Sequence, residues 1–288
     1  MRDLNYQLKG LCHSHREGSF GTQKRRHQIL QQIANELHGL GFRKMQARSL
    51  KPKHVDALVA KWQADGLSVG TVKNRMAILR WWAEKTDKRG VIAASNAHYG
   101  IPDRIFVATE SRARALDATA LMRISDPHVR LSLELQQAFG LRREEAIKCM
   151  PAYADRGDRL LLKASWTKGG RAREIPIVTD TQREILDRAH ALAGKGSLIP
   201  ATRSYVQQLR CYEGQTLKAG LARLHGLRHA YAQARYRALT GWPCPVAGGP
   251  PASHLSPDER ALDRAARLIL SHELGHGREQ ITTVYLGR

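Results

Sequence analysis

The chain has 288 residues, of which 42% are hydrophobic, so it is long enough for about two domains with apolar cores. It carries 47 Lys and Arg against 26 Asp and Glu, a formal net charge of +21. Residues 1–110 hold 19 basic and 9 acidic residues, and residues 111–288 hold 28 and 17, so the basic excess is spread over the chain. This charge argues against an ordinary neutral enzyme and indicates a polyanionic partner, with nucleic acid the first candidate.

Membrane, secreted and disulfide-rich classes find no support in the sequence. No run approaches the roughly 18 apolar residues of a membrane span, and the first residues lack an apolar signal core. The four cysteines (Cys12, Cys149, Cys211 and Cys244) are far apart and form no C-x-x-C pair, which argues against a disulfide framework or a zinc ribbon. We therefore expect no membrane partner and a cytoplasmic, nucleoid-associated protein.

The N-terminal third is predicted to be a small helical domain that follows an arm. Residues 1–26 are polar and basic and predict a flexible arm that could lie along DNA. Residues 27–94 contain three apolar stripes with helical spacing. The stripes are Ile29, Ile33, Leu37; Val55, Leu58, Val59, Trp62; and Val72, Met76, Leu79, Ala83. Residues 95–116 lose this periodicity and predict a linker.

Residues 117–288 are predicted to form a second domain that is mainly α with a small β-sheet, an α+β class. Helices are indicated at 117–125, 128–149, 179–193, 203–213 and 225–239. Strand-like segments at 159–166 and 173–178 flank a Gly-rich turn at 167–171 and predict a hairpin. Residues 241–257 hold five of the eleven prolines, so we expect them to form an irregular loop. Together with the charged segment 258–267, this loop predicts a surface insertion over 241–267.

Four short stretches in this second domain carry candidate chemistry. They are Gly140–Glu145 (G-L-R-R-E-E), Lys168 in the hairpin turn, His225–His229 (H-G-L-R-H), and Leu274-Gly275-His276 with Tyr285 nine residues later. In this order and spacing they resemble the tyrosine recombinases of the lambda-integrase type. Residues 27–94 are similar to that family's helical core-binding domain, on helix count and on the Leu67–Val72 start of the third helix.

The resemblance implies a site-specific recombinase or integrase that cleaves and rejoins DNA without a metal, ATP or any other cofactor. Tyr285 would be the nucleophile and would form a 3′-phosphotyrosyl link. Arg142 and Arg228 would bind the non-bridging phosphate oxygens, where negative charge concentrates in the transition state.

Four further residues receive supporting roles from the same resemblance. His225 and His276 would add hydrogen bonds or proton transfers near neutral pH. Lys168 would protonate the leaving 5′-oxygen. Glu145, three residues after Arg142 and so on the same helical face, would orient that arginine.

The implied partners are duplex DNA, three further copies of the chain on paired DNA sites, and accessory DNA-bending proteins. Candidate DNA contacts, for which a solvated surface is the alternative, are Lys24, Arg25, Arg26, Lys73, Arg75 and Arg80. Two other functions stay open: a non-catalytic DNA-binding regulator of the same fold, and a relaxing enzyme similar to type IB topoisomerases.

One competing motif and two departures from the family pattern remain. Residues 272–276 read H-E-L-G-H, which on one helix could bind zinc, but Glu279 and Thr282 stand where an extended motif needs Gly and His. Arg228 and His276 are 48 residues apart, a wide separation for the family, and three residues follow Tyr285. We therefore expect no metal and consider the 241–267 insertion a candidate for contacts between protomers.

Overall fold

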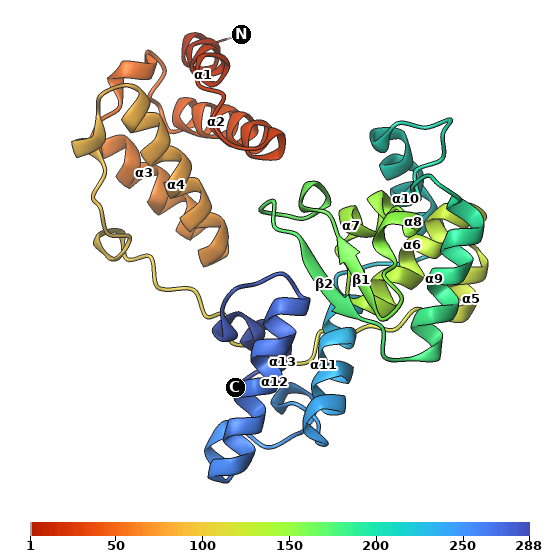
Figure 1. Cartoon of the computed structure of the whole chain (residues 1–288). Helices are drawn as coiled ribbons and strands as arrows, with labels where there is room; N and C mark the ends of the chain where they lie inside the picture. Colours follow the sequence, from red (N-terminus) through yellow and green to blue (C-terminus); the bar gives the residue numbers. More distant parts are fainter. Residues whose placement is uncertain (1) are drawn as a thin grey trace. The chain divides into compact units, whose positions relative to one another are not determined.

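The computed structural model describes residues 2–288, and the chain forms two compact units that divide between Ile105 and Phe106. The division falls inside the predicted linker, and we refer to the N-terminal and C-terminal units. Helices dominate both units, and the described residues contain one two-stranded sheet, β1–β2 (Figure 1). The expected mainly α fold with a small β-sheet is confirmed.

The N-terminal unit consists of four α-helices around one apolar core. These are α1 (Asp3–Ser14), α2 (Phe20–Gly39), α3 (Pro52–Ala64) and α4 (Val69–Lys85), with 3₁₀ turns at Ala47–Ser49, Arg89–Val91 and Ala97–Tyr99. The three predicted apolar stripes are buried on α2, α3 and α4. Ser19 and Ser68 cap α2 and α4 by accepting backbone N–H bonds, which fixes where each helix begins.

The prediction of a flexible arm over residues 1–26 is wrong. Leu4, Leu8 and Leu11 recur at helical spacing, and α1 buries the first two in the core of the N-terminal unit. The backbone N–H of Ala47 donates to Gln7 Oε1 at 2.7 Å, which ties α1 to the rest of the unit. Most of the basic residues of this segment lie outside α1, whose only Lys or Arg is Lys9.

The C-terminal unit packs further helices around a short hairpin. Its α-helices are α5 (Ala118–Met122), α6 (Pro127–Phe139), α7 (Arg143–Lys148), α8 (Pro151–Ala154), α9 (Asp180–Ala193), α10 (Tyr205–Lys218), α11 (Gly226–Thr240), α12 (Pro257–Glu273) and α13 (Thr283–Leu286). The strands β1 (Arg159–Leu162) and β2 (Arg173–Pro176) pair antiparallel, with Leu160 opposite Ile175. Short 3₁₀ turns lie at Ala164–Trp166, Pro245–Ala247, Ala252–His254 and Glu279–Thr282.

The single helix predicted over 128–149 is in fact two helices, α6 and α7. Gly140 ends α6 with a left-handed φ of +61°, and a Cβ there would lie 2.5 Å from Cδ1 of Tyr231. Only glycine fits this turn without strain, so the chain changes direction before α7.

The 241–267 segment is a surface insertion only in its first half. Residues 241–256 form a loop with two 3₁₀ turns, as the prolines predict. From Pro257 the chain is helical, because Ser256 and Glu259 form a capping box at the start of α12. Asp263 and Arg267 are paired and buried on this helix, so the prediction that the charged segment 258–267 belongs to a surface excursion is wrong.

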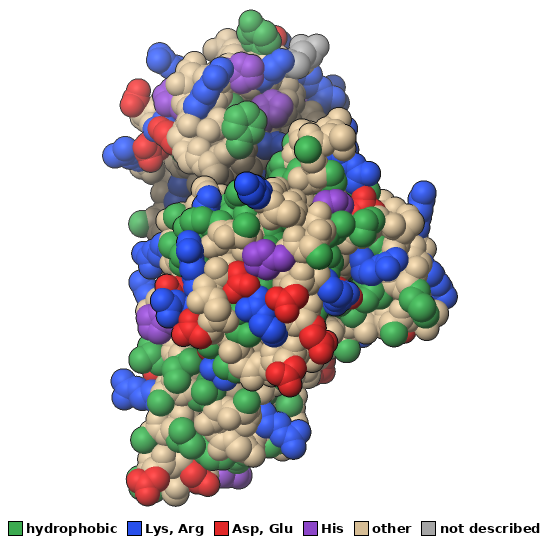
Figure 2. Space-filling model, turned by 45° about the vertical axis from the view of Figure 1, so that its right-hand side comes forward, with side chains coloured by type: hydrophobic (Ala, Val, Ile, Leu, Met, Phe, Trp, Pro, Cys, Tyr) green, Lys and Arg blue, Asp and Glu red, His purple; other side chains and the backbone are tan. Residues whose placement is uncertain are grey.

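The basic excess is present on both units. The N-terminal unit carries 19 Lys and Arg against 8 Asp and Glu, and the C-terminal unit carries 28 against 18. Figure 2 shows lysine and arginine side chains scattered over the visible surface of the chain, interspersed with acidic groups. Within residues 2–288, no helix is long and apolar enough to cross a membrane.

Candidate active site

Arg142 lies at the turn between α6 and α7, immediately before the first residue of α7. Its backbone N–H donates to Glu145 Oε2 at 2.7 Å, and its Nη1 donates to Glu145 Oε1 at 2.8 Å. The expectation that both residues share one helical face is therefore wrong: Glu145 is in the first turn of α7 and reaches back to Arg142. This two-point contact holds the arginine in a defined direction.

The Glu145 carboxylate is buried and also accepts two hydrogen bonds from Arg173 on β2. The Nη1–Oε1 and Nη2–Oε2 distances are 2.9 Å and 2.7 Å. Burial raises the pKa of Glu145, but the ion pair with Arg173 and the bonds from Arg142 outweigh it and lower the pKa to about 2. The group is ionised at neutral pH, and the three-residue cluster keeps one net positive charge.

The Leu274-Gly275-His276 stretch ends α12 and brings a carbonyl into the site. Gly275 has a left-handed φ of +68°, and the backbone N–H of His276 donates to the Ser271 carbonyl at 2.7 Å. The Leu274 carbonyl accepts from Nη2 of Arg142 at 3.4 Å and also from Nη2 of Arg228. Two guanidinium groups from distant parts of the sequence thus meet at one backbone oxygen.

Tyr285, on α13, is buried, and its hydroxyl faces Arg228 on α11. Arg228 Nε donates to the Tyr285 hydroxyl at 3.1 Å, and Nη1 donates to the Gly140 carbonyl at 2.6 Å. Nε2 of His276 lies 3.4 Å from the same hydroxyl. Burial lowers the pKa of Arg228 to about 10, so the guanidinium remains charged at neutral pH.

The histidines around this hydroxyl are neutral at pH 7. Burial, together with the charges of Arg228 and Arg142, lowers the pKa of His276 to about 4. Burial and the nearby His225 lower the pKa of His229 to about 4, and its ring centroid lies 4.7 Å from that of Tyr285. Desolvation and Arg228 lower the pKa of His225 as well, and its ring centroid is 6.3 Å from that of Tyr285. Neutral imidazoles can accept a proton, which a charged imidazole cannot do.

The structure brings most of the predicted site residues together, with one exception. Arg142, Glu145, Arg228, His276 and Tyr285 are linked by direct contacts, and His225 lies beside them. Lys168 is exposed on the loop between β1 and β2, and in the described part of the chain it has no hydrogen bond or ion pair with the others.

Arg173 is the site residue that the sequence reasoning missed. In the strand pattern of β2, Arg173 and Ile175 both point inward, while Glu174 between them is exposed. A basic residue at an inward-facing strand position was the available signal, because a buried charge requires a partner.

The zinc interpretation of residues 272–276 lacks the geometry it needs. The helix ends at Glu273, His272 is exposed, and His276 lies beyond the helix against Tyr285. The Glu273 carboxylate instead accepts bonds from Tyr231 at 2.7 Å and Arg235 at 3.1 Å. Among residues 2–288, no three His, Cys, Asp or Glu side chains are grouped as metal ligands.

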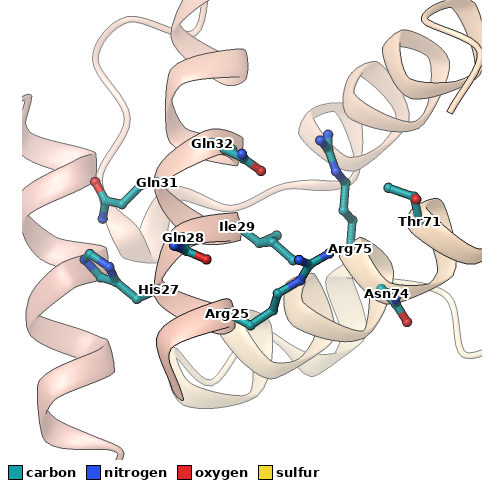
Figure 3. A pocket seen from close by; sticks show the side chains of 9 residues that line it. All are labelled: Arg25, His27, Gln28, Ile29, Gln31, Gln32, Thr71, Asn74 and Arg75. Carbon is teal, nitrogen blue, oxygen red and sulfur yellow. The ribbon is translucent and has the colours of Figure 1, made fainter. Parts of the chain in front are cut away.

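Four of the six candidate DNA contacts have partners inside the N-terminal unit. Arg26 is buried and stacks on Trp81, Lys73 pairs with Asp103, Arg75 pairs with Glu36, and Arg80 donates to Asn96. Lys24 and Arg25 are exposed. Arg25 also borders an open hollow of about 570 Å³ between α2 and α4, which is otherwise lined mainly by polar side chains such as Gln28, Gln32 and Asn74 (Figure 3).

Comparisons with known proteins agree with this architecture. The family model of the phage integrase N-terminal domain matches residues 1–89, and the integrase model matches residues 106–234. No curated protein matches the chain.

Solved structures share the fold. A lambda integrase dimer bound to a COC′ core site is 17% identical, with a TM-score of 0.62 over 98% of this chain and 76% of that one. The Tn1549 transposon integrase in complex with circular intermediate DNA is 14% identical, with a TM-score of 0.58 over 100% and 96%. The XerH recombinase in a post-cleavage complex with its difH substrate is 16% identical, with a TM-score of 0.58 over 99% and 81%.

The two family models, in this order along one chain, define an integrase, an enzyme of the site-specific recombinase class. The chain belongs to the tyrosine recombinase family, as its motifs indicate.

Proposed function

We propose that this recombinase cleaves and rejoins duplex DNA through a 3′-phosphotyrosyl intermediate on Tyr285, with no metal ion or ATP. One observation carries the proposal: the Tyr285 hydroxyl lies between the buried guanidinium of Arg228, at 3.1 Å, and the neutral imidazole of His276, at 3.4 Å. A fixed cation favours the phenolate, and a neutral imidazole can take its proton.

In the cleavage step, Tyr285 Oη bonds to phosphorus and the bond from phosphorus to the 5′-oxygen breaks. The tyrosine proton passes to His276, and the leaving oxygen takes a proton from Lys168 to become a free 5′-hydroxyl. Arg142 and Arg228 offer N–H groups to the non-bridging oxygens, where charge concentrates in the transition state. Attack by a 5′-hydroxyl reverses the step, and since the phosphotyrosyl link conserves the bond energy, rejoining needs no ATP.

Lys168 and His225 would act only once DNA is bound. Both residues are exposed, and Lys168 belongs to the loop that joins β1 to β2. We infer that the bound duplex brings the Lys168 ammonium to the leaving oxygen, while His225 contacts the phosphate from the start of α11.

The test is a covalent adduct on a nicked suicide duplex, selected from a random pool for binding to the full chain. Wild type should form an adduct that survives denaturing gel electrophoresis with EDTA present. Tyr285→Phe should form none, and Tyr153→Phe, which alters a tyrosine outside the site, should match wild type. Lack of a wild-type adduct, or an adduct with Tyr285→Phe, contradicts the mechanism. DNA binding without adduct would favour the regulator, and relaxation of supercoils without paired sites would favour the topoisomerase-like enzyme.

We further propose that exposed cations on the N-terminal unit bind DNA phosphates. Lys24 and Arg25 are exposed, unlike the four candidates with internal partners. Each charge that neutralises a phosphate contributes about 0.9 to the slope of log K against log salt. Replacing Lys24 and Arg25 by Ala should lower that slope by about 2. Lys61→Ala, whose ammonium already lies 2.8 Å from Asp65, should leave the slope unchanged.

The same proposal includes the number of copies that act together on DNA and where in the cell they act. Lambda integrase is known as a tetramer bound to a Holliday junction. We propose that four copies of this chain act on paired DNA sites, with accessory DNA-bending proteins, at the nucleoid in the cytoplasm. Sedimentation of the chain on duplexes carrying one or two sites would measure the number of copies bound.

A further inference from the structure

Arg173 makes contacts that a surface arginine of a hairpin would not make. Its side chain is 6% exposed, and that of its partner Glu145 is 1% exposed. Two of its nitrogens donate to the two oxygens of Glu145, and its Nε donates to the Glu273 carbonyl at 2.9 Å. One guanidinium thus joins the start of α7 to the end of α12.

We propose that Arg173 is a positioning residue for DNA cleavage, which holds Glu145 against Arg142 and holds the Glu273–His276 stretch in place beside Tyr285. This inference rests on the proposed function, because it concerns the groups that act on the phosphate. Arg173 acts through its neighbours and has no contact with Tyr285 in the described structure.

Arg173 restricts the geometry of the groups around it. Both Glu145 oxygens that bond Arg142 also bond Arg173, so the carboxylate accepts four hydrogen bonds and has no freedom to rotate. The Glu273 carbonyl held by Arg173 directly precedes the Leu274 carbonyl that Arg142 and Arg228 share. A shift of Arg173 would therefore move both phosphate-binding arginines.

Arg173 also changes the net charge around Arg142. Arg142 and Glu145 alone would form a neutral pair, and a neutralised arginine would stabilise poorly the charge that concentrates on the phosphate oxygens in the transition state. With Arg173 sharing the carboxylate, the cluster keeps a net positive charge, and Arg142 can offer that charge to DNA. This role explains why Arg173 is buried although its own guanidinium is not placed to bind DNA.

The test compares variants by the rate of adduct formation at saturating DNA and by Kd for the same duplex. Arg173→Met should cleave about 100-fold more slowly, with Kd within about 3-fold of wild type. Arg173→Lys, which keeps the charge but loses the two-point contact, should recover about 10-fold of that loss. Arg235→Met is the matched control, because Arg235 donates to the side-chain carboxylate of Glu273 and not to its backbone carbonyl. Its cleavage rate and Kd should stay within about 3-fold of wild type.

A second variant separates positioning from folding. Arg173→Met leaves Glu145 with one cation fewer in a buried place, whereas Arg173→Met with Glu145→Gln removes both halves of the pair. If Arg173 positions the site, the double variant folds as wild type does and still cleaves at least about 30-fold more slowly. A double variant that cleaves within about 3-fold of wild type overturns the inference, as does unimpaired cleavage by Arg173→Met.

A measurement on the free protein distinguishes this inference from the proposed function. The charged and titratable groups that face His276 are Arg228, Arg142, Arg173, Glu145 and Tyr285. Loss of one cation from this set should raise the titration midpoint of the His276 imidazole in NMR spectra of Arg173→Met, and Arg235→Met should leave it unchanged. If the titration midpoint of His276 is the same in Arg173→Met as in wild type, the inference that Arg173 lies beside this imidazole and positions it is overturned. Absence of any wild-type adduct would overturn the proposed function, while the midpoint would still decide the positioning role.

Discussion

Replacing Glu145 by Gln preserves the size of the side chain and removes the one carboxylate that pairs with both Arg142 and Arg173. Two buried or half-buried guanidinium groups then lack a counter-ion, which costs about 3–5 kcal/mol when one partner of a buried pair is removed. The lowered pKa of Glu145 gives a second estimate of the free energy by which the ion pairs stabilise the folded state. A pKa of about 2 in place of 4.5 corresponds to about 3 kcal/mol, at about 1.4 kcal/mol for each pKa unit. We expect a loss of about 3 kcal/mol in the unfolding free energy of the C-terminal unit at pH 7.

The sign of the pH dependence follows from the lowered pKa. The stabilisation by ionised Glu145 is complete above the unfolded-state value of 4.5 and is lost as pH falls towards about 2. Wild type therefore loses about 3 kcal/mol across this interval that Glu145→Gln cannot lose. The stability curves of the two proteins should converge at acid pH.

The assay is urea unfolding of the full chain, followed by hydrogen exchange in peptides from α7 and β2, which separates this unit from the N-terminal one. Glu174→Gln is the control: it lies next to Arg173, is exposed and pairs with Arg159 at 3.3 Å, so it should change stability by less than about 1 kcal/mol. A loss below about 1 kcal/mol for Glu145→Gln, or parallel acid curves, would refute the reasoning.

Three further predictions concern both units. Leu8→Ala should cost the N-terminal unit about 2–5 kcal/mol in urea unfolding, whereas Tyr6→Ala on the exposed face of α1 should cost little; a flexible arm would show no difference. Gly140→Ala should destabilise the C-terminal unit more than Gly157→Ala, because both have positive φ but only the first would place a Cβ 2.5 Å from Tyr231. The single-turnover cleavage rate should fall as pH drops towards about 4, where His276 becomes protonated and cannot take the tyrosine proton; a midpoint near 6.5 would speak against that role.

Sequence patterns over a few residues predicted the helices and the turn that depend mainly on neighbouring residues. The stripes of α2, α3 and α4 and the Gly-rich hairpin turn follow from periodicity and turn chemistry over a few residues. The motif stretches placed Arg142, Arg228, His276 and Tyr285 near one another, because their order and spacing match a known family.

Features set by distant residues could not be predicted in this way. The break between α6 and α7 depends on the ring of Tyr231, which lies 91 residues after Gly140. Arg75 resembled a free cation because its partner, Glu36, is 39 residues earlier in the chain. Over residues 1–26 the polar and basic residues outnumber the apolar ones, and this composition obscured the repeat of three leucines in α1.

The shared Leu274 carbonyl also makes the positions of both arginines depend on one segment of backbone. It joins Arg142 and Arg228 across sequence separations of 132 and 46 residues, and both arginines are synthesised before it. Contacts between residues this far apart in the sequence cost more loop-closure entropy than local contacts do. Opening the stretch from Leu274 to Tyr285 would remove this shared acceptor, while Glu145 would still hold Arg142 and the Gly140 carbonyl would still hold Arg228. The relative placement of the two guanidinium groups therefore depends on the backbone conformation of this one segment.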